Sequence, residues 1–167
     1  MKWRKAFLAG IVGAALMTIM LSSANAAGFH VLDFSMMWGT LTGLPLGTAA
    51  WLAGFGIQLV VGGLFALIYA LVFNVFSAAG AVRGAGIGIL HAGTTGIFLP
   101  LLPLVHPLMN NGHMQSPGPY FAGHGIPGVL FYFGMHVVYG ITVGWLYARM
   151  VPEAKNVPES GDLRIAA

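Results

Sequence analysis

Long stretches without a charged residue constrain this chain more than any other feature. No charge lies in the 27 residues between Lys5 and Asp33, or in the 49 residues between Asp33 and Arg83. A further 65 uncharged residues separate Arg83 from Arg149. A membrane-spanning helix needs about 20 consecutive apolar residues. The three gaps therefore have room for one span, one or two spans, and two spans, in that order.

The composition agrees with a lipid environment. Charged residues make up 7% of the 167 residues, hydrophobic residues 57%, and the mean hydropathy is +0.84, whereas a soluble domain carries about a quarter charged residues. The pI near 9.5 rests on a few scattered basic residues, so we interpret it as a topology signal and predict no nucleic-acid partner. The absence of cysteine excludes disulfides, thiolate metal sites and thiol catalysis.

Four apolar runs predict four spans, at about residues 6–26, 48–76, 84–105 and 126–148. The runs lack the two-residue alternation of membrane barrel strands, and a bilayer core forces backbone hydrogen bonds to close within a helix. We therefore predict an all-α integral membrane bundle of four transmembrane helices over residues 1–150. A polar tail over residues 151–167 is expected to follow it on the cytoplasmic side.

The basic residues predict the orientation of the chain. With a cytoplasmic amino terminus, every lysine and arginine falls on the cytoplasmic side, as the positive-inside rule requires: Lys2, Arg4, Lys5, Arg83, Arg149, Lys155 and Arg164. Both termini are then cytoplasmic. Residues 1–26 also fit a secretory signal peptide that ends in an A-x-A cleavage site. We favour retention of this segment as the first span and leave cleavage open.

An internal repeat relates the two halves of the chain. Residues 56–70 and 134–148 share five identities in 15 positions, among them Gly62 with Gly140. A weaker match pairs Gly10 with Gly84 and continues through the first and third spans. The pattern predicts a duplicated helical hairpin, with halves related by an axis along the membrane normal.

Small residues at four-residue spacing predict the contact faces of the helices, because they let backbones approach closely in lipid. The expected packing positions are Gly62, Ala66, Gly84, Gly88, Gly140 and Gly144. Polar residues share these stripes: Gln58 lies four residues before Gly62, His136 four before Gly140, and His91 three after Gly88. We expect these polar side chains to face the bundle interior.

Several of these segments together resemble a known family. They are AGIVGAALMT in the first span, WG in the first outer loop, RGAGIGILHAG in the third span and GMHVVYGITVGWLYA in the fourth. They are similar to a family of small four-helix bacterial inner-membrane proteins without an assigned function. The resemblance implies the same fold and a bacterial inner membrane, and it implies no activity. Members often carry histidine where this chain has Gln58, which argues against an all-histidine site.

Two metal or cofactor hypotheses follow from the histidines. The outer side collects His30, Asp33, Met36, Met37, His106, Met109, His113, Met114 and His124, and the segment with His106, Met109, His113 and Met114 has the imidazole and thioether ligands that suit copper. His91 and His136 could instead hold a haem, with neighbouring glycines leaving room for the macrocycle. Counted from the flanking arginines, however, the two histidines lie ~12 Å and ~20 Å deep, which disfavours haem. Histidines hydrogen-bonded across helices are the favoured interpretation.

The sequence favours a non-enzymatic role. Paired acids, a Ser-His-Asp set, a phosphate loop and HExxH are all absent, so we predict a structural or accessory membrane protein. The runner-up is passage of a small solute or ion along Gln58, His91, Thr94, Thr95 and His136. Against passage, the spans contain no acidic residue for a proton relay. Four helices also make only a narrow pore unless a homo-oligomer forms.

Overall fold

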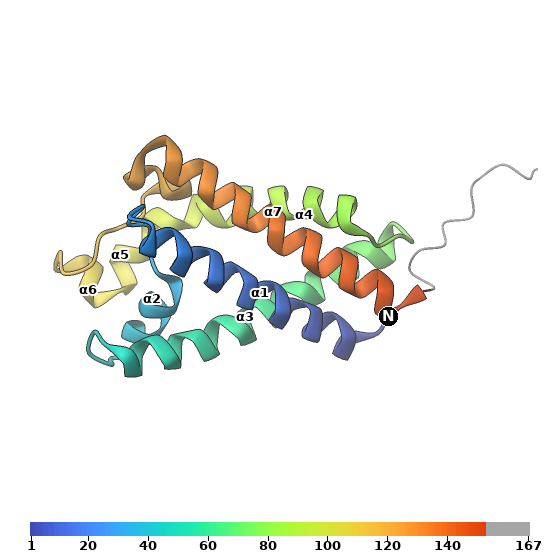
Figure 1. The fold of residues 1–167 in the computed structure, drawn as a ribbon, viewed down its shortest axis with the longest axis horizontal. Helices are drawn as coiled ribbons and strands as arrows, with labels where there is room; N and C mark the ends of the chain where they lie inside the picture. Colours follow the sequence, from blue (N-terminus) through green and yellow to red (C-terminus); the bar gives the residue numbers. More distant parts are fainter. Residues whose placement is uncertain (153–167) are drawn as a thin grey trace, which may run out of the picture.

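Four long helices form the body of the protein in a computed structural model that describes residues 1–152. They are α1 (Trp3–Ala26), α3 (Thr48–Val75), α4 (Ala81–Phe98) and α7 (Gly125–Met150), and they run along the long axis of the molecule (Figure 1). With the short turns that continue α4 and precede α7, each is long and apolar enough to cross a membrane. The predicted all-α, four-span architecture is confirmed, and the chain is a multi-pass membrane protein. The predicted tail lies almost wholly outside the described residues.

Short elements gather at one end of the bundle (Figure 1): α2 (Phe34–Leu41), η1 (Leu99–Leu101), α5 (Leu102–Val105), α6 (Pro107–Asn110) and η2 (Pro119–His124). Two prolines explain the end of α4. Pro100 and Pro103 lack the backbone N–H that an α-helix needs, so regular α-helix ends at Phe98 and gives way to a 3-10 turn.

The helix α2 was not expected, because the segment between the first two predicted spans was expected to be an outer loop. Eight residues are too few to span a bilayer, and the segment instead packs along α3. Its start is capped by Asp33, whose carboxylate accepts a hydrogen bond from the backbone N–H of Met36 at 3.1 Å. The same carboxylate accepts a bond from the indole N–H of Trp51 on α3 at 3.0 Å. One acidic side chain thus both starts α2 and ties it to α3.

The amino terminus and the end of α7 meet at the opposite end of the bundle (Figure 1). The backbone N–H of Lys2 donates to the Tyr147 hydroxyl at 3.3 Å, and the Lys5 ammonium donates to the Met150 carbonyl at 2.6 Å. The start of α4 lies there too, because Gly80 contacts Gly144 of α7. Lys2, Arg4, Lys5, Arg83 and Arg149 therefore share this end. Whether it faces the cytoplasm stays a prediction, and Lys155 and Arg164 lie outside the described residues.

Three seams hold the long helices together. Between α4 and α7, a Cβ atom added at either Gly84 or Gly140 would overlap the other residue's carbonyl oxygen, and one added at Gly88 would overlap that of His136. Between α1 and α3, a Cβ at Gly10 would overlap the Gly62 carbonyl.

The contact partners repeat from one hairpin to the other. Ala66 meets Gly10 in the α1–α3 seam, and Gly144 meets Gly84 in the α4–α7 seam. These are the positions that the proposed repeat equates. The duplication itself stays a prediction.

The third seam joins α1 to α7, where the ring of Tyr139 packs against Gly13. A Cβ atom added at Gly13 would lie only 2.7 Å from this ring. The fourth side of the bundle is different. Within residues 1–152, the backbones of α3 and α4 pack together almost nowhere along their lengths, although a short turn connects them. Large side chains bridge that side instead. The rings of Phe65 and His91, for example, have centroids 4.2 Å apart. The bundle is therefore closed along three seams and open between α3 and α4.

Candidate functional site

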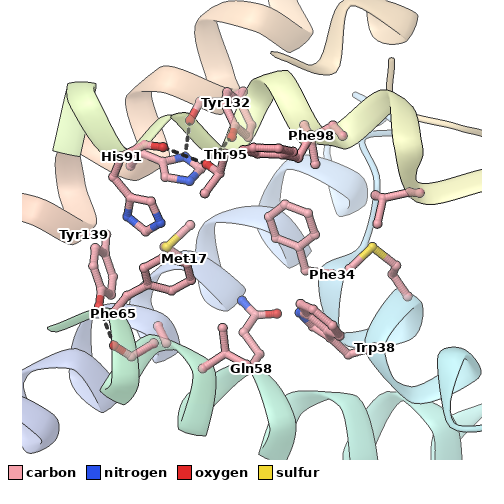
Figure 2. Close-up of a pocket in the computed structure, with 17 residues that line it drawn as sticks. Met17, Phe34, Trp38, Gln58, Phe65, His91, Thr95, Phe98, Tyr132 and Tyr139 are labelled. Carbon is pink, nitrogen blue, oxygen red and sulfur yellow. Dashed lines mark hydrogen bonds between the residues drawn. The ribbon is translucent and has the colours of Figure 1, made fainter. Parts of the chain in front are cut away.

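A cavity of about 290 Å³ lies on the open side of the bundle, near the lower end of the range for small-molecule sites. All four long helices and α2 contribute to its wall. Figure 2 shows aromatic side chains around it, from α2, α3 and α4: Phe34, Trp38, Phe65 and Phe98. Phe98 is also 64% exposed, so the wall of the cavity reaches the outer surface of the bundle at this residue.

Gln58 brings an unpaired polar group into this apolar space. Its side chain rises from α3 into the cavity between Phe65 and Trp38 (Figure 2), and the residue is only 6% exposed. The amide oxygen is buried and has no hydrogen-bond partner. A buried polar atom without a partner costs about 1–3 kcal/mol, so an amide held in this position needs an explanation.

His136 adds a hydrogen-bond acceptor to the same cavity. Its Nδ1 atom lies 2.8 Å from the carbonyl oxygen of Tyr132, one turn earlier on α7. A carbonyl can only accept, so Nδ1 carries the proton of the neutral ring. Nε2 is then the atom with a free lone pair. The side chain of His136 is 5% exposed and lines the cavity.

His91 contacts the ring of His136 edge to face, with the two centroids 5.0 Å apart. Its Nδ1 atom pairs with the hydroxyl of Tyr69 on α3 at 3.2 Å. The hydroxyl of Thr95 donates to the His91 carbonyl at 2.7 Å and lies 2.7 Å from the hydroxyl of Tyr132. These polar contacts link side chains of α3, α4 and α7, although the backbones of α3 and α4 hardly pack against each other.

Aromatic side chains fill the interior between the cavity and the end of the bundle where the amino terminus meets the end of α7. Tyr69 packs edge to face on Tyr139 and on Phe73, with ring centroids 5.5 Å and 6.3 Å apart. Phe73 in turn stacks on Tyr147, with centroids 6.0 Å apart. All four are 3% exposed or less. The hydroxyl of Tyr139 also donates to the Gly62 carbonyl on α3. The cavity is therefore closed in this direction by a packed layer.

The structure brings together the four intramembrane candidates from the sequence, because Gln58, His91, Thr95 and His136 all line this cavity. Thr94 does not join them: it is exposed, and its hydroxyl bonds to the carbonyls of Leu90 and His91. Sequence reasoning missed Tyr132 and Tyr139. The available signal was that a tyrosine hydroxyl inside a membrane span must find a partner.

Two arguments about His91 and His136 were wrong. The depth argument took Arg83 and Arg149 as markers of one level. Gly84 in fact faces Gly140, so Arg149 lies nine residues, ~13 Å, beyond that contact.

The room expected beside the glycines is also absent at Gly88 and Gly140, because the opposite backbone occupies it. With the two imidazole rings in direct contact, no macrocycle fits between them.

The outer His and Met residues serve other contacts. His106 is fully buried, and its Nε2 atom lies 3.2 Å from the Thr40 hydroxyl and 3.1 Å from the Met37 carbonyl of α2. His113 is exposed and pairs with the Asn111 amide oxygen at 2.8 Å. Met109 is buried and Met114 half-buried. Across residues 1–152, no group of three His, Asp or Glu residues is placed to hold a metal ion.

Comparisons with protein-family models, with curated proteins and with solved structures find no match to this chain. The resemblance to the four-helix inner-membrane family stays a prediction. Any functional argument therefore depends on the cavity itself.

Proposed function

We propose that this chain is a non-enzymatic accessory protein of the bacterial inner membrane that binds a small, bilayer-soluble molecule in the cavity between α3 and α4. The observation that carries the proposal is the buried, unpaired amide oxygen of Gln58 inside an apolar cavity. A bound molecule supplies the hydrogen-bond partner that this oxygen lacks within the protein.

The lipid environment supports this proposal. Lipid tails are as apolar as leucine, so no hydrophobic force drives α3 and α4 together. A cavity between them is then stable, and an apolar molecule dissolved in the bilayer reaches it without crossing water. The exposed side chain of Phe98 marks the place on the lipid-facing surface where the cavity begins.

Solute passage is the weaker alternative. The polar residues that favour it, Gln58, His91 and His136, do share one cavity. A path through the bundle would also have to pass the packed layer around Tyr69 and Phe73. Passage therefore requires this packed layer to rearrange, whereas binding of a ligand from the bilayer does not.

The test uses a brominated hexylbenzene, whose bromine quenches tryptophan fluorescence at short range. The full-length protein in lipid nanodiscs should show saturable quenching, because Trp38 lines the cavity. The Val61→Trp variant fills the cavity from α3 and should bind no probe.

Val60→Trp is the matched control, since Val60 is the preceding residue, is 51% exposed and faces away. Binding should persist in this variant, with affinity like that of the wild type. Quenching that never saturates in the wild type would contradict the proposal.

The proposed orientation has its own test. A reporter fused after Ala167 should be active only in the cytoplasm, and one inserted near Asn111 only outside. Both reporters on one side would contradict the topology.

The mature protein should begin at or near Met1, because α1 supplies two of the three seams. An amino-terminal sequence that starts at Ala27 would show that residues 1–26 are a cleaved signal peptide.

A further inference from the structure

We infer that the molecule bound between α3 and α4 is a phenol: an aromatic ring whose hydroxyl donates to Gln58 or to His136 and whose apolar substituent extends into the bilayer. This inference rests on the proposed binding function and names its ligand class. Three features of the cavity carry it: the direction of its free hydrogen bonds, its aromatic wall and its opening to lipid.

Two free hydrogen-bonding atoms of the cavity are acceptors, and they call for a donor on the ligand. The Oε1 atom of Gln58 is an acceptor without a partner. The Nε2 atom of His136 is also an acceptor, because the bond to the Tyr132 carbonyl fixes the proton on Nδ1. A ketone, ester or ether has no hydrogen to offer and would leave both atoms unpaired. A hydroxyl group donates to one of them and can accept a bond from the Gln58 amide N–H in return.

The wall of the cavity favours a ring over an alkyl chain next to that hydroxyl. Phe34, Phe65 and Trp38 surround the Gln58 amide (Figure 2). Aromatic rings attract one another in offset or edge-to-face arrangements beyond the effect of buried area alone. A phenolic hydroxyl, with its pKa near 10, is also a stronger donor than an aliphatic one. A phenol therefore matches both the polar atoms and the apolar wall.

The opening of the cavity accounts for the apolar substituent. The cavity wall continues from Gln58 along α4 to Phe98 and then to Leu99 and Leu102, which are half-buried. Since α3 and α4 do not close over this side, a chain attached to the ring can leave the bundle between them. Its exit lies among lipid tails, so the substituent has to be apolar.

The experiment compares two probes of nearly equal size, para-hexylphenol and para-hexylanisole, in which a methyl ether replaces the hydroxyl. Each competes against the brominated hexylbenzene for the full-length protein in nanodiscs. We expect the phenol to bind about tenfold more tightly than the ether, as one donated hydrogen bond to a buried acceptor predicts. Correction for each probe's partition into protein-free nanodiscs keeps the comparison to the cavity.

Two variants test the named acceptors. Gln58→Leu removes the unpaired amide and should reduce the tenfold preference to about threefold or less. Gln115→Leu is the matched control, because Gln115 is an exposed residue of the loop before η2; its preference should equal that of the wild type. His136→Phe keeps a ring and removes the other acceptor, so it decides the outcome if Gln58→Leu does not fold.

The outcomes separate the two proposals. If all three probes fail to bind saturably, the binding function is wrong. If they bind but the wild type does not distinguish phenol from ether, the phenol assignment alone is wrong. The phenol assignment is also wrong if the preference survives unchanged in both Gln58→Leu and His136→Phe.

Discussion

The α1–α7 seam and the α3–α4 side of the bundle occupy corresponding places in the proposed repeat, and they differ sharply. On the first side, Gly13 provides a recess that the ring of Tyr139 fills. On the second, Phe65 and Tyr69 of α3 meet His91 of α4 through large side chains. The backbones stay apart there, and a cavity of about 290 Å³ remains.

The difference shows how a membrane bundle keeps an internal space. In lipid, helices associate through close packing and hydrogen bonds rather than through exclusion of water. A seam closes where a glycine admits a neighbouring backbone or ring. Where large rings meet across the gap, the helices are held at the distance that those rings set. A cavity then costs less than it would in a soluble core, because lipid-soluble molecules can fill it.

The largest expected effect is at the tightest seam, between α4 and α7. Gly140→Leu places a side chain against the Gly84 carbonyl, where no rotamer change can relieve the overlap. We expect a loss of about 3 kcal/mol in the free energy of unfolding, the upper end for overpacking. Equilibrium unfolding in detergent measures it.

Gly134→Leu is the matched control on the same helix, because an added Cβ at Gly134 meets nothing within 4 Å. It should leave stability within about 0.5 kcal/mol of the wild type. The proposed repeat also predicts that Gly62→Leu on α3 lowers the free energy of unfolding about as much as Gly140→Leu does. Equal tolerance of leucine at all three positions would contradict the seam assignment.

A smaller loss is expected at the α1–α7 seam. Gly13→Leu meets the Tyr139 ring, a side chain that can move rather than a backbone atom. We expect about 1–2 kcal/mol of destabilisation, from overpacking that is partly relieved. Thermal denaturation would measure the effect, and a loss as large as that of Gly140→Leu would show that the Tyr139 ring cannot move.

Removing one hydroxyl should cost less again. Tyr139→Phe keeps the ring in the Gly13 recess and deletes the hydrogen bond to the Gly62 carbonyl. The expected loss is about 1 kcal/mol, the net worth of one buried hydrogen bond. The same unfolding assay checks it, and an unchanged free energy of unfolding would mean that this bond does not stabilise the bundle.

The open side between α3 and α4 should tolerate a larger side chain with the smallest loss of stability. Val61→Leu extends a cavity-lining side chain into empty space, so stability should change by less than about 0.5 kcal/mol. The comparison between the two sides predicts that this variant is nearly silent in unfolding and weakens probe binding. A loss of more than about 1 kcal/mol would indicate that α3 and α4 pack too closely around Val61 to leave a cavity there.

The sequence predicted the four spans because long uncharged gaps leave few other solutions. It also identified Gln58, His91 and His136 as a group, since residues on one stripe of small and polar side chains turn toward the same interior. It did not predict the relative depth of the two histidines. Arginines marked the membrane boundary in that argument, but α7 continues well past the start of α4, so Arg83 and Arg149 mark different levels.

Two other features could not follow from periodicity. The cavity depends on how far apart α3 and α4 stand, and that distance is set by tertiary contacts such as the one between Tyr69 and His91. The helix α2 is too short for a hydropathy pattern to distinguish it from a loop. Its capping residue, Asp33, was a usable signal, because an aspartate before an apolar run is typical of a helix start.

The carboxylate of Asp33 also makes part of the cavity wall depend on a contact between two helices. An eight-residue helix is not stable by itself in water, and α2 gains its stability from its cap and from the bond to Trp51 on α3. The stability of α2 therefore depends on its contact with α3. Phe34 and Trp38, which α2 contributes to the cavity wall, are positioned with it. The wall of the cavity is therefore complete only when α2 is docked on α3.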